Sequence, residues 1–198
     1  MNKTLLQSVR EYKKQSLLTP ILVVLEVLME VLIPMEMAKI IDVGMAHGDL
    51  HYIIQRGIIL VIMAMLALFF GISAGNTAAV AGAGYAKNLR HDIFYKVQQF
   101  SFKNIDHFAT SGLVTRMTTD ITNIQMAYMM SIRLLARAPI MIILSWVMTL
   151  TYSKTVALLF LIVIPLLGGT LMFIAKKAHP HFIKVFDEYD ILNNSVQE

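Results

Sequence analysis

The sequence has no cysteine and few charged residues, and both shortages limit what the protein can be. Without cysteine there can be no disulfide framework and no thiolate metal site. Charged residues make up 15% of the 198 residues, whereas hydrophobic residues make up 57%. That balance excludes a disordered chain and is too apolar for an ordinary soluble domain. We therefore expect a membrane protein.

The longest stretch without charge, Gly57 to Ala86, is long enough to cross a bilayer as a helix. Three other apolar segments have the same character. Together they predict an all-α polytopic membrane protein with membrane helices at about 17–41, 57–86, 134–152 and 155–175.

Proline is absent from residues 52–98, and the helical period continues through the whole segment. At 1.5 Å per residue this is roughly 70 Å of helix, and residues 111–152 give roughly 60 Å. A hydrocarbon core of about 30 Å accommodates only half of either helix. We therefore expect cytoplasmic extensions at 87–133 and 176–198, with the polar stretch 98–121 at the tip, held far from the lipid.

The distribution of basic residues predicts the orientation. Lysine and arginine gather near the N-terminus, in residues 87–137 and in residues 176–184. The opposite side holds only three: Lys39, Arg56 and Lys154. By the positive-inside rule the N-terminus and the tip are cytoplasmic. The net charge of +4 is thus explained by topology, and we expect no nucleic-acid partner.

Residues 1–15 place Leu5, Val9 and Tyr12 on one helical face and basic residues on the other. This pattern predicts an amphipathic helix that lies at the membrane interface.

Two acidic residues, Glu26 and Glu30, stand four apart in the first membrane helix. A carboxylate facing lipid is costly, so their shared face is expected to point into protein or a wet cavity. Either ligand or cation contact, or hydrogen bonding to neighbouring helices, would suit them. We add three further cavity candidates: Met29, Asn76 and Trp146. Gly71, Gly75 and Ala79, also four apart, predict a surface for close helix contact.

Several short motifs, in order, resemble one transporter family. Pro34 with Ile41-Asp42-x-Gly44 is similar to the end of that family's first helix, and Leu89-Arg90-x-Asp92-Ile93-Phe94 to its descending second helix. Phe100 through Phe108 resembles its first coupling helix, and Thr110 through Asp120 the start of its ascending third helix. The family is the ATP-binding-cassette (ABC) exporters, whose six-helix transmembrane domain this chain resembles over its first four helices.

The resemblance implies a fifth and a sixth membrane helix and a cytosolic ATPase domain that binds ATP and Mg. It also implies a second half-transporter, as a heterodimer or a homodimer, a small lipophilic substrate and a multi-pass location in the inner membrane. Ser111 stands where the family usually has glycine, a variant most similar to bacterial heterodimeric multidrug exporters. The residues implied to contact the nucleotide-binding domain are Phe102, Asn104, Ile105, Asp106, His107 and Phe108.

No catalytic site is expected within these residues, since Gly82-Ala83-Gly84 is only a Gly-x-Gly inside a helix and not a phosphate-binding loop. We interpret Arg116 and Asp120 as a structural ion pair. No metal site is expected, because His179 and His181 have no third ligand in view. The helical pattern runs on to Glu198, so we expect a fragment of a longer protein.

Two other functions remain open from the residues alone. One is a proton-coupled secondary transporter that uses Glu26 and Glu30, and the other is a non-catalytic membrane scaffold that recruits a cytosolic partner. The length of the cytoplasmic extensions argues against the first, because secondary transporters usually have short loops.

Overall fold

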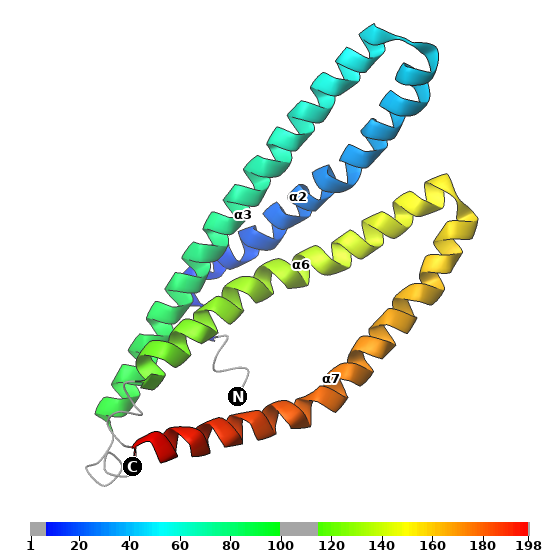
Figure 1. Ribbon diagram of the computed structural model, residues 1–198. Helices are drawn as coiled ribbons and strands as arrows, with labels where there is room; N and C mark the ends of the chain where they lie inside the picture. The colour runs from blue at the N-terminus through cyan, green and yellow to red at the C-terminus, as the bar shows by residue number, and fades with distance from the viewer. Residues whose placement is uncertain (1–6, 100–114, 198) are drawn as a thin grey trace. The chain divides into compact units, whose positions relative to one another are not determined.

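The computed structural model describes residues 7–99 and 115–197, with side chains as far as residue 178 (Figure 1). Every element in these ranges is helical, and four helices are long and apolar enough to cross a membrane. The predicted all-α membrane fold is therefore confirmed. In chain order the elements are η1 (Arg10–Tyr12), α2 (Lys13–Lys39), η2 (Ile40–Met45), α3 (Leu50–Gln98), η3 (Arg116–Asp120), α6 (Ile121–Tyr152) and α7 (Lys154–Gln197).

α2 and α3 form an antiparallel hairpin (Figure 1). The π-helix η2 continues α2, and Gly48 adopts a φ of +64° in the short connection, a conformation that glycine reaches without steric cost. The Asp49 side chain accepts a hydrogen bond of 3.0 Å from the Tyr52 backbone N–H and so caps α3. Helical structure therefore occupies most of residues 42–56, between the first two expected membrane helices.

Ion pairs lie at the end of the hairpin where α2 connects to α3. Glu36 accepts from Lys39 at 2.6 Å and from Arg56 of α3 at 2.8 Å. The Arg56 guanidinium also lies 5.2 Å from the centre of the Tyr52 ring. Glu36 of α2 is therefore paired with Arg56 of α3 where the chain reverses, as a charge in an apolar helix requires.

α3 is a single α-helix of 49 residues, about 70 Å long, which is more than twice the thickness of a hydrocarbon core of about 30 Å. Its small residues make close contacts, but of the expected row Gly71, Gly75 and Ala79 only Gly71 takes part in one. Gly75 faces open space and Ala79 is exposed, whereas a neighbouring face buries Ala74, Ala78 and Ala81. Both faces carry small residues at spacing four, so the spacing could not decide which one packs.

Residues 1–144 and 145–198 form two units. In the first, the α6 segment up to Leu144 contacts the hairpin at two levels. At the level nearer the N-terminus of α2, Tyr85 stacks on Tyr128, with ring centres 4.5 Å apart. The apolar cluster beside that stack consists of Val9, Tyr85, Ala86, Leu89 and Ile121.

The second unit is described by itself. α6 ends at Tyr152 and α7 starts at Lys154, and the Trp146 indole N–H donates to the Ala157 carbonyl at 3.2 Å across this turn. Large apolar side chains from Val156 to Ile174 are exposed all around α7. A helix that is apolar on all sides is typical of a membrane environment.

Candidate functional site

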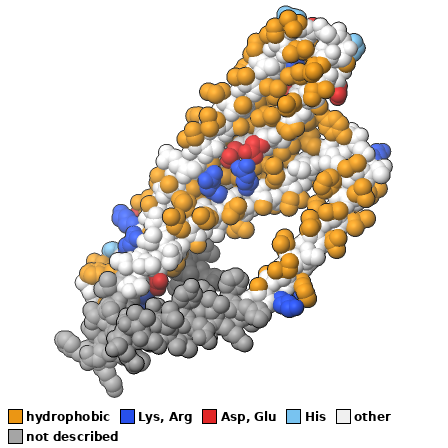
Figure 2. All heavy atoms as spheres, in the orientation of Figure 1, with side chains coloured by type: hydrophobic (Ala, Val, Ile, Leu, Met, Phe, Trp, Pro, Cys, Tyr) orange, Lys and Arg blue, Asp and Glu red, His pale blue; other side chains and the backbone are white. Residues whose placement is uncertain are grey.

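The first unit joins two helices through one group of charges, which we call the charge triad: Glu26, Glu30 and Arg137. The Arg137 guanidinium of α6 donates to Glu26 of α2 at 3.0 Å. It also donates to both carboxylate oxygens of Glu30, at 2.8 and 2.7 Å. Both bonds to Glu30 come from Nη2 of Arg137, while Nη1 binds Glu26. Hydrogen bonds between charged groups are stronger than neutral ones. On the face drawn in Figure 2, acidic and basic side chains meet among hydrophobic ones.

The second helix of the hairpin, α3, makes room for this group. A Cβ on Gly71 of α3 would stand 2.9 Å from Oε1 of Glu26, so close that the carboxylate would have to shift. The Glu26 side chain is 12% exposed, and its Oε2 is buried without a hydrogen-bond partner among the described residues. Glu30 and Arg137 are more open, at 32% and 36%. The triad is therefore closed towards Gly71 and accessible at Glu30.

Apolar contacts position the helices that carry the triad. Val23, Val27 and Ala74 are buried where α2 meets α3. Residues of α6 cover this cluster at spacing four: Ala136, Ile140 and Leu144. Since Arg137 follows Ala136, the same contact brings its side chain to the carboxylates on α2. Arg133, one turn earlier, is half-buried and forms no ion pair with either carboxylate.

The triad lies deep in the apolar region. Gly71 is fourteen residues from Gly57 and fifteen from Ala86, the ends of the uncharged stretch of α3. That places it about 21 Å from either end. Arg137 binds Glu26 beside Gly71, so its side chain lies level with the middle of the uncharged stretch of α3. The start of the membrane segment of α6 at about residue 134 stays a prediction.

Of the other cavity candidates, neither Met29 nor Asn76 takes part in the ion pairs of the carboxylates. Met29 is half-buried on α2, and Asn76 is exposed on α3. Trp146 belongs to the second unit. The predicted pair was thus on one face as expected, but its partner Arg137 was missed. A signal was present, since two carboxylates in an apolar helix need a cation nearby.

The residues predicted to contact a nucleotide-binding domain lie outside the described residues, as they fall within 100–114. Arg116 and Asp120 are the two ends of the π-helix η3. Their ion pair stays a prediction. Arg90 of α3 reaches towards the start of α6, at 3.4 Å from the Met117 carbonyl and from the Thr122 hydroxyl.

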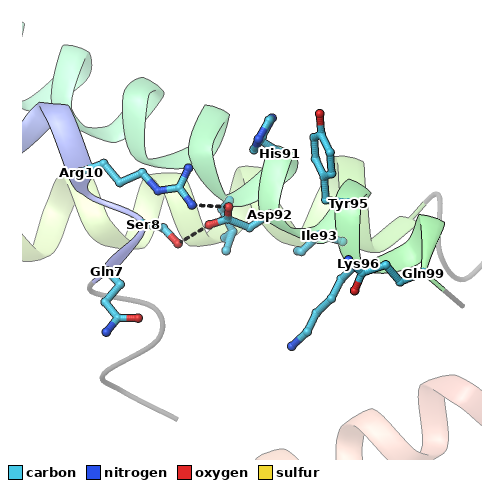
Figure 3. A pocket seen from close by; sticks show the side chains of 10 residues that line it. Gln7, Ser8, Arg10, His91, Asp92, Ile93, Tyr95, Lys96 and Gln99 are labelled. Carbon is cyan, nitrogen blue, oxygen red and sulfur yellow. Dashed lines mark hydrogen bonds and ion pairs between the residues drawn. The ribbon is translucent and has the colours of Figure 1, made fainter.

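The N-terminal segment is bound to the C-terminal part of α3. Asp92 accepts from Arg10 at 2.6 Å and from the Ser8 hydroxyl at 3.0 Å, while Asn88 donates to the Ser8 carbonyl at 2.9 Å (Figure 3). Arg10 has a φ of +38°, a strained conformation for a residue with a side chain, and these contacts hold it there. The described part of the predicted interfacial helix is η1 followed by the start of α2. Its position at a membrane surface stays a prediction.

A cleft of about 510 Å³ lies beside this attachment, and side chains of both signs line it. Lys96, His91 and Tyr95 border it from α3 and are exposed (Figure 3). Within the described residues, no three His, Asp or Glu side chains gather in a way that could hold a metal ion.

The comparison with known proteins agrees with this architecture. Residues 16–198 match the family described as the ABC transporter transmembrane region. The ABC transporter ATP-binding protein YfiB of Bacillus subtilis is 30% identical over 178 residues, which cover 90% of this chain and 31% of that protein. An ABC transporter ATP-binding protein of Mycobacterium tuberculosis is 26% identical over 192 residues, covering 97% of this chain and 33% of its own length.

A putative ABC transporter ATP-binding protein of Mycoplasma genitalium is 28% identical over 138 residues, which cover 70% of this chain and 22% of that protein. The chain spans about a third of the length of the first two relatives. Because the family match extends over nearly the whole sequence and agrees with four long apolar helices, the chain belongs to the ABC transporter transmembrane region family.

Proposed function

We propose that the chain is the N-terminal transmembrane portion of an ATP-driven exporter for small lipophilic compounds. In this proposal it forms part of the translocation pathway and transmits the movements of nucleotide-binding domains to it. The domains bind ATP and Mg, and a second half-transporter, different or identical, completes the pathway. The protein lies in the inner membrane with its N-terminus in the cytoplasm.

The observation that carries the proposal is the length of α3. Its 49 residues extend about 70 Å, more than twice the hydrocarbon thickness, within a family of ABC transporter transmembrane regions. A helix of that length can hold a turn far from the lipid, where a soluble domain can reach it. The relatives' names as ABC transporter ATP-binding proteins also support such a domain as a partner. These findings favour ATP-driven export over proton-coupled transport or a non-catalytic scaffold.

The charge triad is the polar contact that we assign to the pathway. It lies level with the middle of the uncharged stretch of α3, and Glu30 and Arg137 are partly accessible. Charged groups at such depth are costly and usually mark a pathway for a ligand or an ion.

Transport by the complete protein, with its ATPase domains and partner subunit, tests this function. Inside-out vesicles that contain it should accumulate a lipophilic dye only when hydrolysable ATP and Mg are present. A non-hydrolysable ATP analogue is the control. Accumulation that follows an imposed pH gradient without ATP would replace the proposal with secondary transport, and no accumulation in either case would favour the scaffold.

The coupling role makes a first prediction about residue 108, which lies outside the described part of the chain. Phe108→Ala in the complete transporter should lower the number of substrate molecules moved per ATP hydrolysed. An apolar anchor in a partner's groove contributes roughly 1 to 3 kcal/mol to a contact, and the truncation removes it. Transport and hydrolysis are measured in the same vesicles.

Thr110→Ala, in the same polar stretch, is the matched control and should keep the wild-type ratio. A Phe108→Ala variant with the wild-type ratio would show that the turn transmits nothing.

A further inference from the structure

The net charge of the charge triad depends on Arg137 as well as on its two carboxylates. Two carboxylates and one guanidinium leave one net negative charge near the middle of the apolar stretch. Arg137 binds both acids at once, and Glu26 is the anchored one because it is buried against Gly71. Glu30 is the accessible one, with 32% of its side chain exposed.

We propose that Arg137 and Gly71 are the residues that position this pair and set its charge, and that the triad discriminates ligands by their charge. The inference rests on the proposed function, in which the triad contacts the ligand. Gly71 admits the Glu26 carboxylate to the surface of α3. Arg137 neutralises one of the two acids and holds the Glu30 carboxylate in a fixed orientation. A singly charged cation is then favoured over a neutral or an anionic compound of the same shape.

The two glycines of the predicted contact row offer a matched pair of variants. A Cβ at residue 71 meets the Glu26 carboxylate at 2.9 Å, whereas a Cβ at residue 75 meets nothing within 4 Å. Both substitutions replace glycine by alanine inside the same helix, so their effects on helix propensity are equal. Any difference between Gly71→Ala and Gly75→Ala therefore reports on the position of Glu26.

The charge itself is tested with three probes of one shape: tetraphenylphosphonium, neutral tetraphenylsilane and tetraphenylborate. Binding is measured to the complete transporter in lipid nanodiscs. The wild type should bind the cation more tightly than the neutral compound, and the anion least. Glu30→Gln removes the net charge and should weaken cation binding about tenfold, as for unit charges roughly 12 Å apart at an effective dielectric constant of about 20. The neutral probe should change little.

A double variant separates charge from structure. Removing Arg137 alone would leave the buried Glu26 carboxylate without a partner, and an unpaired buried charge can prevent folding. Glu26→Gln with Arg137→Gln removes both partners and restores one net negative charge. It should keep the wild-type preference for the cation, while Glu26→Gln with Glu30→Gln should reverse it in favour of the anion. A merely structural triad would lower the affinity for all three probes together.

The outcomes separate the inference from the function on which it rests. Gly71→Ala should reduce the cation preference and Gly75→Ala should not. If the wild type transports with ATP but its preference does not follow the charge of the variants, the inference is wrong and the function stands. Failure of the wild type to bind tetraphenylphosphonium also overturns the inference. Absence of ATP-driven transport by the wild type overturns the proposed function instead.

Discussion

Two glycines in α3, Gly82 and Gly84, leave space for side chains of neighbouring segments. Gly84 lies under the ring of Tyr12, so closely that a Cβ at residue 84 would overlap the ring carbons. Gly82 meets α6 in the same way, because its added Cβ would stand 3.3 Å from the Cβ of Met129. Both glycines are buried, although a helix interior normally disfavours glycine. The cost in helix propensity is therefore offset by close contact between helices.

This contact predicts the effect of a methyl group at residue 84. Gly84→Ala should lower the melting temperature of the complete transporter, because the ring of Tyr12 must move and overpacking costs about 1 to 3 kcal/mol. The gain in helix propensity, about 1 kcal/mol, does not compensate. Gly57→Ala is the control, since a Cβ there meets nothing within 4 Å. It should leave the melting temperature unchanged or raise it. Equal effects of the two variants would contradict this role of Gly84.

At the scale of elements, α6 is attached to the hairpin by polar contacts at two depths. The inner attachment is Tyr128, which stacks on Tyr85 of α3 and shares a 2.7 Å hydrogen bond with the Ser16 hydroxyl of α2. The outer attachment is the charge triad. Beside the triad, Ala136, Ile140 and Leu144 of α6 pack on the apolar cluster of α2 and α3. The two polar groups together define the register of α6.

We expect the inner attachment to be separable into its two parts. Tyr128→Phe removes the hydrogen bond to Ser16 and should cost about 1 kcal/mol. Tyr128→Ala also removes the ring from Tyr85 and should cost more, because a stacked pair adds about 0.5 to 1.5 kcal/mol beyond its buried area. The melting temperatures of the two variants measure this order. Tyr95→Phe, at an exposed ring on α3, should have no effect. A larger loss in Tyr128→Phe than in Tyr128→Ala would refute the assignment.

At the scale of the whole molecule, four long apolar helices need a membrane, and the basic residues predict its orientation. Lys96 near the end of α3 and Lys154 at the start of α7 should then lie on opposite sides. The chain has no cysteine, so a single introduced thiol can be labelled without background from this region.

A membrane-impermeant maleimide distinguishes the two sides. Lys154→Cys should react in intact cells, and Lys96→Cys only after the cells are made permeable. The same protein without the introduced cysteine serves as the control. The reverse pattern would invert the topology and would place the extensions of α3 and α6 outside the cytoplasm, where no ATP-driven domain could reach them.

The sequence by itself determined the helical class, the number of long apolar helices and the great length of α3. These properties follow from local composition and period: an uncharged stretch from Gly57 to Ala86 and the absence of proline from 52 to 98 suffice. The acidic pair was also found this way, because Glu26 and Glu30 are one helical turn apart.

Only the tertiary structure decided what the pair binds and which glycines pack. Arg137 is 107 residues from Glu30 along the chain, and its distance from the acids depends on how far α6 is displaced along α2. Likewise, the rows through Gly75 and Ala74 are equally small, and only contact with another helix tells them apart. A periodic pattern specifies the face of one helix, but the relative register of two helices arises from side chains that meet only after both have formed.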